Sequence, residues 1–275
     1  MANGSGLAIT GLIVGIVIAT QVGDFESTDI DLPDVDSRSD EDLDSAPDED
    51  LDSAPDEDVD SAPEEVPTDI DGGILGVGMT GAVTSVGGGA KVVALTFSSG
   101  PNPIYTPQVL DVLDLHDVPA TFCIIGEQAW DHPELVRRIA DEGHTLCNQG
   151  LTQDAQLADR DDAEIQAEVE GGRDAIEAAA PGVDVPFLRA PDGAFSPRLN
   201  DIAEAYDHAP LGWSLDPRDR EELGPSAIVD TVLDDVLPGD VVVLHDGSGD
   251  RSDTVAALDT LIIDLQNEGY EIVVP

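Results

Sequence analysis

The sequence predicts an α/β barrel that follows a membrane helix and a disordered acidic stalk. Three observations support this fold class. From Lys91 onward, buried-strand patterns alternate with amphipathic helical patterns. Residues 6–22 form an uncharged apolar run, and residues 24–71 form a strongly acidic, repetitive segment. The predicted domains are therefore an anchor (1–23), a linker (24–71), a glycine-rich connector (72–90) and a folded domain (91–275).

Strand and helix patterns alternate throughout the folded domain. The strand patterns are VVALTF, ATFCIIG, HTLCN, FLRAP, APLGWSL, DVVVLHD and YEIVV. The helical patterns between them are TPQVLDVLDLHD, HPELVRRIADEG, AEIQAEVEGGRDAIEAA, SPRLNDIAEAY, SAIVDTVLDDVL and SDTVAALDTLIIDLQNEG. Such alternation gives a parallel sheet with helical crossovers. The number of units favours a small barrel over an open sheet, and barrel chemistry lies at the C-terminal ends of the strands.

The apolar run GLAITGLIVGIVIATQV predicts a retained membrane anchor at residues 6–22. As a helix it would be about 25 Å long, enough to cross a bilayer with its flanking residues. The preceding MANGSG lacks the basic residues of a secretory signal, and IATQV offers no Ala-x-Ala cleavage site. Membrane lipid is thus an expected partner. The acidic stretch that follows favours placing the rest of the chain outside the cell, away from the anionic inner leaflet.

The linker contains a recurring eight-residue unit: EDLDSAPD, EDLDSAPD and EDVDSAPE. We count 22 acidic residues and one arginine between residues 24 and 71, so the segment carries 1 − 22 = −21. Regular prolines interrupt helices, and like charges extend the chain. A disordered stalk is therefore predicted. The alternative is calcium binding, which would be weak without a glycine turn and a terminal bidentate glutamate.

Two smaller features remain open at the sequence level. In the connector, ILGVG and AVTSV are possible short strands, with Gly87–Gly89 as a turn. The chain has two cysteines, Cys123 and Cys147. We expect both to be small buried hydrophobic residues, with one disulfide as the alternative if the domain lies outside the cell.

Charge excludes nucleic acid as a partner. The formal net charge is −48, and Lys91 is the single lysine. Phosphates would be repelled by such a chain. The acidity extends over both halves of the sequence, which favours a protein adapted to high salt over a local acidic binding surface. A halophilic archaeon, or a virus of one, is the expected source.

Five motifs occur in order along the folded domain: TFSSGP (Thr96–Pro101), NQGLTQD (Asn148–Asp154), RAPDGAFSP (Arg189–Pro197), WSLDPRDR (Trp213–Arg220) and VVLHDG (Val242–Gly247). From about Val92 to Pro275 the chain resembles the polysaccharide deacetylase family, carbohydrate esterases that remove acetyl groups from chitin, peptidoglycan and xylan. The resemblance implies a distorted (β/α) barrel without a full set of eight units. It also implies zinc or a similar divalent metal as cofactor.

The residues that the family uses for metal catalysis are changed here. Family enzymes carry two aspartates in the first motif, a general base and a metal ligand, where this chain has Ser98 and Ser99. Two histidine ligands of the second motif correspond to Gln149 and Gln153. Neutral hydroxyls and amides cannot replace the hydration of a divalent ion, and without metal no hydroxide forms near neutral pH. We therefore expect no metal and no cofactor.

Other family positions are retained. By resemblance, Arg189 holds the base, Asp219 tunes the catalytic histidine, and His245 is that histidine, the general acid. The preferred explanation for the retention of Asp219 and His245 is that they form a satisfied buried hydrogen-bonded pair. Leu244 would line the acetyl pocket, and Trp213 or Tyr105 would stack on sugar. Arg220 stands where the family usually has a tryptophan, and Asp216 and Asp246 are expected to be turn and capping residues.

The sequence thus predicts a membrane-anchored surface protein whose deacetylase-like domain is a glycan-binding or structural pseudoenzyme. Its partner would be a polysaccharide or a glycoprotein glycan. The alternative is an active hydrolase in which Ser98 or Ser99 forms a triad with His245 and Asp219. A different metal site could be formed by Cys123, His144 and Cys147. The predicted burial of both cysteines in strands makes core packing the preferred interpretation.

Overall fold

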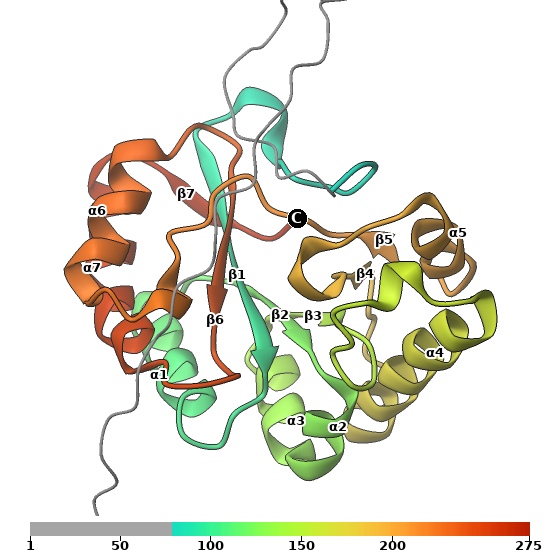
Figure 1. Cartoon of the computed structure of the whole chain (residues 1–275). Helices are drawn as coiled ribbons and strands as arrows, with labels where there is room; N and C mark the ends of the chain where they lie inside the picture. The colour runs from blue at the N-terminus through green and yellow to red at the C-terminus, as the bar shows by residue number, and fades with distance from the viewer. Residues whose placement is uncertain (1–78) are drawn as a thin grey trace, which may run out of the picture. The chain divides into compact units, whose positions relative to one another are not determined.

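The computed structural model describes residues 79–275, which form a parallel α/β half-barrel (Figure 1). The strands lie in the order β5-β4-β3-β2-β1-β6, and β7 pairs with β1. Their bounds are β1 (Val92–Gly100), β2 (Thr121–Ile124), β3 (Thr145–Asn148), β4 (Phe187–Leu188), β5 (Ala209–Pro210), β6 (Val241–His245) and β7 (Glu271–Val273). The two outer strands of this order, β5 and β6, do not pair. An isolated bridge between Leu215 and Val242 joins the chain that follows β5 to β6.

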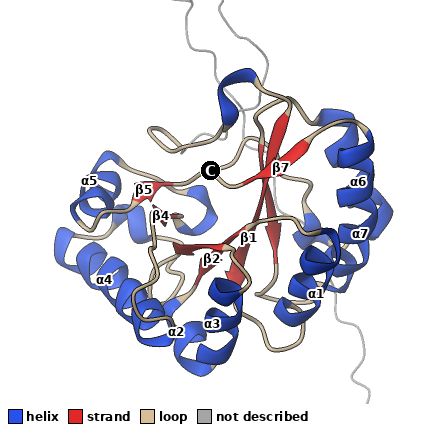
Figure 2. Ribbon diagram, turned by 180° about the vertical axis from the view of Figure 1, so that it is seen from behind, coloured by secondary structure: helices blue, strands red, loops and turns tan. Residues whose placement is uncertain are grey.

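Within residues 79–275, seven α-helices pack around the sheet (Figure 2). They are α1 (Thr106–His116), α2 (Gly126–Asp131), α3 (Pro133–Asp141), α4 (Asp162–Ala179), α5 (Pro197–Ala205), α6 (Pro225–Asp235) and α7 (Ser252–Asn267). Local sequence sets several of the helix starts. Asp161 and Glu164 form a capping box at α4, the Ser196 hydroxyl caps α5, and a proline occupies the first turn of α1, α3 and α6.

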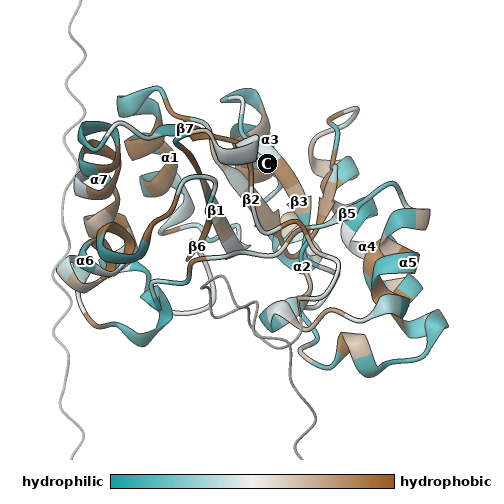
Figure 3. Ribbon diagram, turned by 90° about the horizontal axis from the view of Figure 1, so that it is seen from above, coloured by the Kyte–Doolittle hydropathy of each residue, from teal (hydrophilic) through white to brown (hydrophobic). Residues whose placement is uncertain are grey.

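The strands divide their residues between two faces of the sheet. Phe97, Phe122 and Leu146 lie in the core between strands and helices, and hydrophobic colour is strong on the strands in Figure 3. The next residues along, Ser98, Cys123 and Cys147, occupy paired positions on β1, β2 and β3. Because successive side chains of a strand point to opposite faces, these three form a row on the inner face.

The connector is partly built into the domain, which corrects the predicted start at residue 91. The Val83 N–H donates to the Pro210 carbonyl, and the Gly212 N–H donates to the Val83 carbonyl. Met79 and Ala82 pack against the hydrophobic cluster of α4 and α5. AVTSV makes isolated bridges at Val83 and Ser85 instead of a continuous strand, and Gly87–Gly89 is a 3-10 turn. The proposed strand ILGVG lies outside the described residues.

Between residues 79 and 275, no helix is both long and apolar enough to cross a bilayer. The expected anchor at 6–22 and the acidic linker at 24–71 lie outside the described residues. The helix α2 is an addition to the sequence prediction. Its six residues, GEQAWD, are too few to show a helical period.

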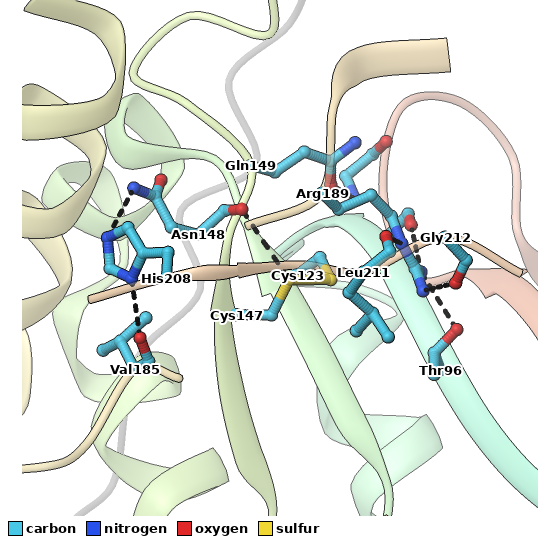
Figure 4. Close-up of a disulfide and its surroundings, with 12 residues drawn as sticks. Thr96, Cys123, Cys147, Asn148, Gln149, Val185, Arg189, His208, Leu211 and Gly212 are labelled. Carbon is cyan, nitrogen blue, oxygen red and sulfur yellow. Dashed lines mark hydrogen bonds between the residues drawn. A yellow bond between two sulfur atoms is a disulfide. The ribbon is translucent and has the colours of Figure 1, made fainter. Parts of the chain in front are cut away.

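Cys123 and Cys147 form a disulfide (Figure 4). This corrects the expectation of two free buried cysteines. The two residues face each other across the parallel pair β2–β3, and both are fully buried beside Leu211. The register of two strands brings them together, and the spacing of the cysteines in the sequence does not reveal that register.

Removal of the disulfide should destabilise the domain. The bond closes a loop with a sequence separation of 24 residues, and a loop of this length corresponds to roughly 3 kcal/mol of unfolded-state entropy. Cys123→Ala together with Cys147→Ala should therefore lower the free energy of unfolding by about this amount in denaturant titrations. Dithiothreitol should lower the midpoint of the wild type to that of the double variant and leave the variant unchanged. Two titratable thiols in the unfolded, unreduced protein would contradict the bond.

Candidate functional site

A small polar cavity lies where β1, β3 and β6 end. Ser98 and His245 are paired positions on neighbouring strands, and Gln149 directly follows β3. The cavity has a volume of about 20 Å³, room for about one water molecule. Its lining residues come from all five sequence motifs and are Ser98, Ser99, Gln149, Gln153, Arg189, Ala190, Asp192, Trp213, Asp216, Arg220, Val243 and His245.

The three residues at the family's metal-ligand positions bond to one another. The Ser99 backbone N–H donates to Gln149 Oε1 at 2.8 Å, and Gln153 Nε2 donates to Ser99 Oγ at 2.6 Å. Gln153 Oε1 in turn accepts from the Ser248 hydroxyl at 3.1 Å. The sequence motifs therefore identified side chains that do meet in space, although their chemistry differs from the family pattern.

This set of residues does not fit a catalytic divalent metal. The Gln149 amide oxygen is already occupied by a backbone N–H, so the Gln149 NH₂ group faces away from that donor. No charged ligand is available among Ser99, Gln149 and Gln153. Residues 79–275 also contain no group of three His, Cys, Asp or Glu side chains arranged for a metal. The suggested site from Cys123, His144 and Cys147 is ruled out because both sulfurs are in the disulfide.

Arg189 is a buried cation held by neutral groups. It is 1% exposed. Its Nη1 donates to Thr96 Oγ1 at 2.9 Å and Ser98 Oγ at 3.0 Å, and its Nε and Nη2 donate to the carbonyls of Leu211 and Gly212. Figure 4 shows this guanidinium near the disulfide. Burial lowers the Arg189 pKa to about 9, and no carboxylate offsets it.

His245 and Asp219 form a buried pair. His245 Nδ1 lies 2.8 Å from Asp219 Oδ1, and the His245 N–H donates to Asp219 Oδ2 at 2.8 Å. The Thr254 hydroxyl donates to the same Oδ2 at 2.8 Å. The ring Nε2 has no hydrogen-bond partner within residues 79–275. In that range neither Ser98 nor Ser99 bonds to His245, so the contact that a serine triad requires is absent from this arrangement.

The three residues expected to bind substrate lie in different places. Trp213 is partly exposed and lines the cavity, with its ring 5.5 Å from the Arg189 guanidinium. Leu244 does not line it, which corrects that assignment: Leu244 is buried in the core on the opposite face of β6, and Val243 lines the cavity. Tyr105 is also outside the lining, and its hydroxyl donates to Asp250 at 2.9 Å.

Sequence reasoning missed an ion pair at the cavity. Arg220 Nη1 lies 3.3 Å from Asp192 Oδ1, and both residues are exposed. The available signal was the Pro-Asp-Gly turn in the third motif, where Asp192 has a positive φ of 52°. Asp216 also lines the cavity, and its carboxylate accepts from the Arg218 N–H. Asp216 is therefore a turn residue, as expected.

Asp246 follows His245 in the chain, and its carboxylate is buried with only one oxygen hydrogen-bonded. It is 1% exposed. Its Oδ2 accepts from the Thr106 hydroxyl at 2.6 Å, and its Oδ1 has no partner within residues 79–275. Burial raises the Asp246 pKa to about 7, with a smaller contribution from Asp219. The expectation that Asp246 is a turn or capping residue missed this burial, which depends on the close approach of Gly100.

Comparisons with known proteins agree with the motifs. Residues 85–211 match the model of the polysaccharide deacetylase family. A chitooligosaccharide deacetylase of Sinorhizobium fredii is 43% identical over 197 residues, 68% of this chain and 91% of that protein. A peptidoglycan-N-acetylglucosamine deacetylase of Bacillus cereus is 35% identical over 201 residues, 70% of this chain and 91% of that protein.

A solved structure adds a second kind of relative. A CE4 family pseudoenzyme of Bacillus anthracis superposes with a TM-score of 0.65 at 26% identity, over 70% of this chain and 66% of that chain. A mutant of that pseudoenzyme has been solved with restored enzymatic activity. The half-barrel, the five motifs around one cavity and the relatives all agree: this chain belongs to the polysaccharide deacetylase family.

Proposed function

We propose that the domain is a glycan-binding pseudoenzyme that does not remove acetyl groups. The observation that carries this proposal is that Ser99, Gln149 and Gln153 are neutral groups joined by hydrogen bonds through Ser99. These groups are neutral, and the Gln149 oxygen already accepts from the Ser99 N–H. A divalent ion would have to break these bonds and would receive no carboxylate, thiolate or imidazole ligand from the three positions in return. Without the ion, water at this cavity keeps its ordinary high pKa.

The loss of a general base supports the same conclusion. Ser98 holds the position from which the family's aspartate acts, and its oxygen accepts a bond from Arg189. A hydroxyl cannot serve as a base at neutral pH. The buried His245–Asp219 pair joins β6 to the loop that carries Asp219, so its retention is explained by the fold alone.

Relatives give the glycan proposal its ligand class. Two curated relatives are named for chitooligosaccharide and for peptidoglycan N-acetylglucosamine. The Bacillus anthracis relative is described as a pseudoenzyme, so the fold exists without activity in this family. In this chain, Trp213 lines a cavity rich in hydroxyl and amide groups, the combination that sugars bind through stacking and hydrogen bonds.

Chitooligosaccharides are the first ligands to test. Calorimetric titration of the full chain in high salt should give measurable binding, and Trp213→Ala should weaken it by roughly two- to tenfold, because an aromatic contact is worth about 0.5–1.5 kcal/mol beyond its burial. Trp130→Ala is the matched control, since Trp130 is 59% exposed on α2 and does not line the cavity. Equal loss in both variants, or no binding by the wild type, would remove the glycan role.

The alternative function, an active hydrolase that uses a serine with His245 and Asp219, is tested by measuring acetate release. The unbonded Nε2 of His245 faces no serine partner, so wild-type protein should release no acetate from acetylated chitooligosaccharides, with or without added Zn²⁺. Turnover that His245→Ala abolishes would overturn the pseudoenzyme proposal.

We also propose that the domain lies outside the cell, held by residues 6–22 in a membrane of a halophilic cell or its virus. The buried disulfide supports this placement, because such bonds persist in oxidising compartments. The net charge of −48 supports a high-salt environment. Digestion of the domain by protease added to intact cells would support the placement, and complete protection would contradict it.

A further inference from the structure

The cavity contains a positive charge that no group of the described chain neutralises. Arg189 is 1% exposed, and its four hydrogen-bond acceptors are two hydroxyls and two carbonyls. A buried ion without a counterion is costly, and proteins normally pair such a charge. Arg189 is therefore a buried cation without a counterion, and it lines the cavity of about 20 Å³.

The groups around this space have hydrogen-bond donors to spare. Ser98 Oγ accepts from Arg189 and makes no donated bond within residues 79–275, so its hydrogen is free. The Ser99 hydroxyl accepts from Gln153 in the same way. The Gln149 oxygen is fixed on a backbone N–H, which leaves its NH₂ group without a bonded partner in that range. Free donors beside a buried cation select an anion over a cation or a neutral acceptor.

Carboxylates near the cavity do not fill this role. Asp192 is exposed and pairs with Arg220, and Asp216 accepts from a backbone N–H in its own turn. Asp219 is fully engaged by His245 and Thr254. Consistent with this, burial is the whole cause of the Arg189 pKa shift, with no carboxylate contribution.

We propose that the cavity binds one monoatomic anion, chloride in ordinary solutions, held by the Arg189 guanidinium and by free hydrogens of Ser98, Ser99 and Gln149. The cavity volume selects a single particle close to water in size, and a halide ion meets that limit better than acetate or a larger carboxylate. The bound ion supplies the missing counter-charge and so stabilises the folded domain. The anion and a glycan would use groups of the same cavity, so the two proposals are tested separately, by bromide binding here and by Trp213→Ala for the glycan.

Bromide is the direct probe. Crystals of the full chain grown in sodium bromide should show one anomalous peak in this cavity, beside the Arg189 guanidinium and within hydrogen-bond reach of Ser98 Oγ. In solution, the melting temperature should rise as chloride replaces gluconate at constant ionic strength, by roughly 3–5 °C per tenfold increase beyond half-saturation. Gluconate is too large for the cavity, so it reports the effect of salt alone.

Ser98→Asp tests the ion-pair argument without removing Arg189. Its carboxylate would replace the halide, so the chloride-dependent rise of the melting temperature should disappear. Chloride bound to the wild type should also broaden the ³⁵Cl resonance in nuclear magnetic resonance, and this broadening should disappear in the variant. Ser226→Asp is the control, because it adds the same charge at an exposed position in the first turn of α6 and should keep both signals. Absence of the bromide peak, or equal chloride dependence in the wild type and Ser98→Asp, would overturn the proposal. Binding of formate in the cavity under conditions in which bromide does not bind would also overturn it, because the cavity would then be a carboxylate site.

Discussion

Replacing four residues should give this chain one tightly bound Zn²⁺ and deacetylase activity. The four changes are Ser98→Asp, Ser99→Asp, Gln149→His and Gln153→His. The Gln153 side chain bonds to the Ser99 hydroxyl at 2.6 Å, and the Gln149 side chain bonds to the Ser99 backbone N–H at 2.8 Å. One carboxylate and two imidazoles placed at these three positions can therefore share one ion. A carboxylate at 98 would meet the Arg189 guanidinium, and His245 is already held by Asp219.

The backbone favours this conversion. Ser99 has φ of 68° and Gln153 has φ of 60°. Among residues other than glycine, aspartate and histidine are enriched at positive φ. The new residues should therefore suit these positions at least as well as serine and glutamine do. The folded domain should keep its stability, and the measured gain should come from chemistry alone.

Metal content and acetate release are the measurements. Plasma emission analysis should give about one zinc per quadruple variant and none per wild-type chain. Turnover of acetylated chitooligosaccharides should rise above the wild-type background by at least the 10²–10⁴-fold that a general base contributes. Ser98→Asp alone is the control, because it restores the base and no ligand, so it should remain inactive. Zinc in the wild type, or a fully loaded but inactive quadruple variant, would contradict the loss of function by these substitutions.

The second large effect concerns stability and pH at Asp246. Its pKa is raised by burial to about 7, against about 4 in an unfolded chain. Between these values the folded state binds more protons than the unfolded state, so the free energy of unfolding falls as pH rises from 4 to 7 and then levels. Three pKa units correspond to up to about 4 kcal/mol. Asp246→Asn should remove this loss and make the protein more stable at pH 8.

Denaturant titrations of the variants at several pH values, in constant high salt, measure the effect. High salt screens the repulsion between the many other carboxylates. Asp230→Asn is the matched control, since Asp230 is exposed on α6 and its replacement changes the net charge equally. The difference between the two variants should grow from pH 4 to pH 7. A difference that does not change with pH would mean that Asp246 is charged in the folded protein.

Much of the fold follows from local patterns. Each of the seven strand patterns contains a strand, and the longer helices follow from their periodicity, because burial in a parallel sheet leaves continuous apolar runs. The short helix α2 was missed because six residues are too few to show a helical period. The contacts of the connector beyond Met79 were missed because their partners are distant in sequence. Val83, for example, is bonded to Pro210 and Gly212.

The site could be predicted in composition but not fully in geometry. The motifs placed Ser98, Gln149 and Arg189 around one cavity, because the ends of parallel strands meet at one edge. The assignment of Leu244 to the cavity was wrong for a reason present in the sequence. Leu244 is adjacent to His245 on one strand, so the two side chains point to opposite faces. The disulfide and the burial of Asp246 depend on register and close packing, which no short motif encodes.

The Val83 contact has a mechanical consequence. The Gly212 N–H is bonded to Val83, and the carbonyl of the same Gly212 accepts from Arg189. A pulling force that enters the domain at Met79 would pass through two hydrogen bonds before it reached the buried guanidinium. A fragment cut at residue 91 would lose the bonds of Val83 to Pro210 and Gly212, and with them one support of the carbonyl that accepts from Arg189.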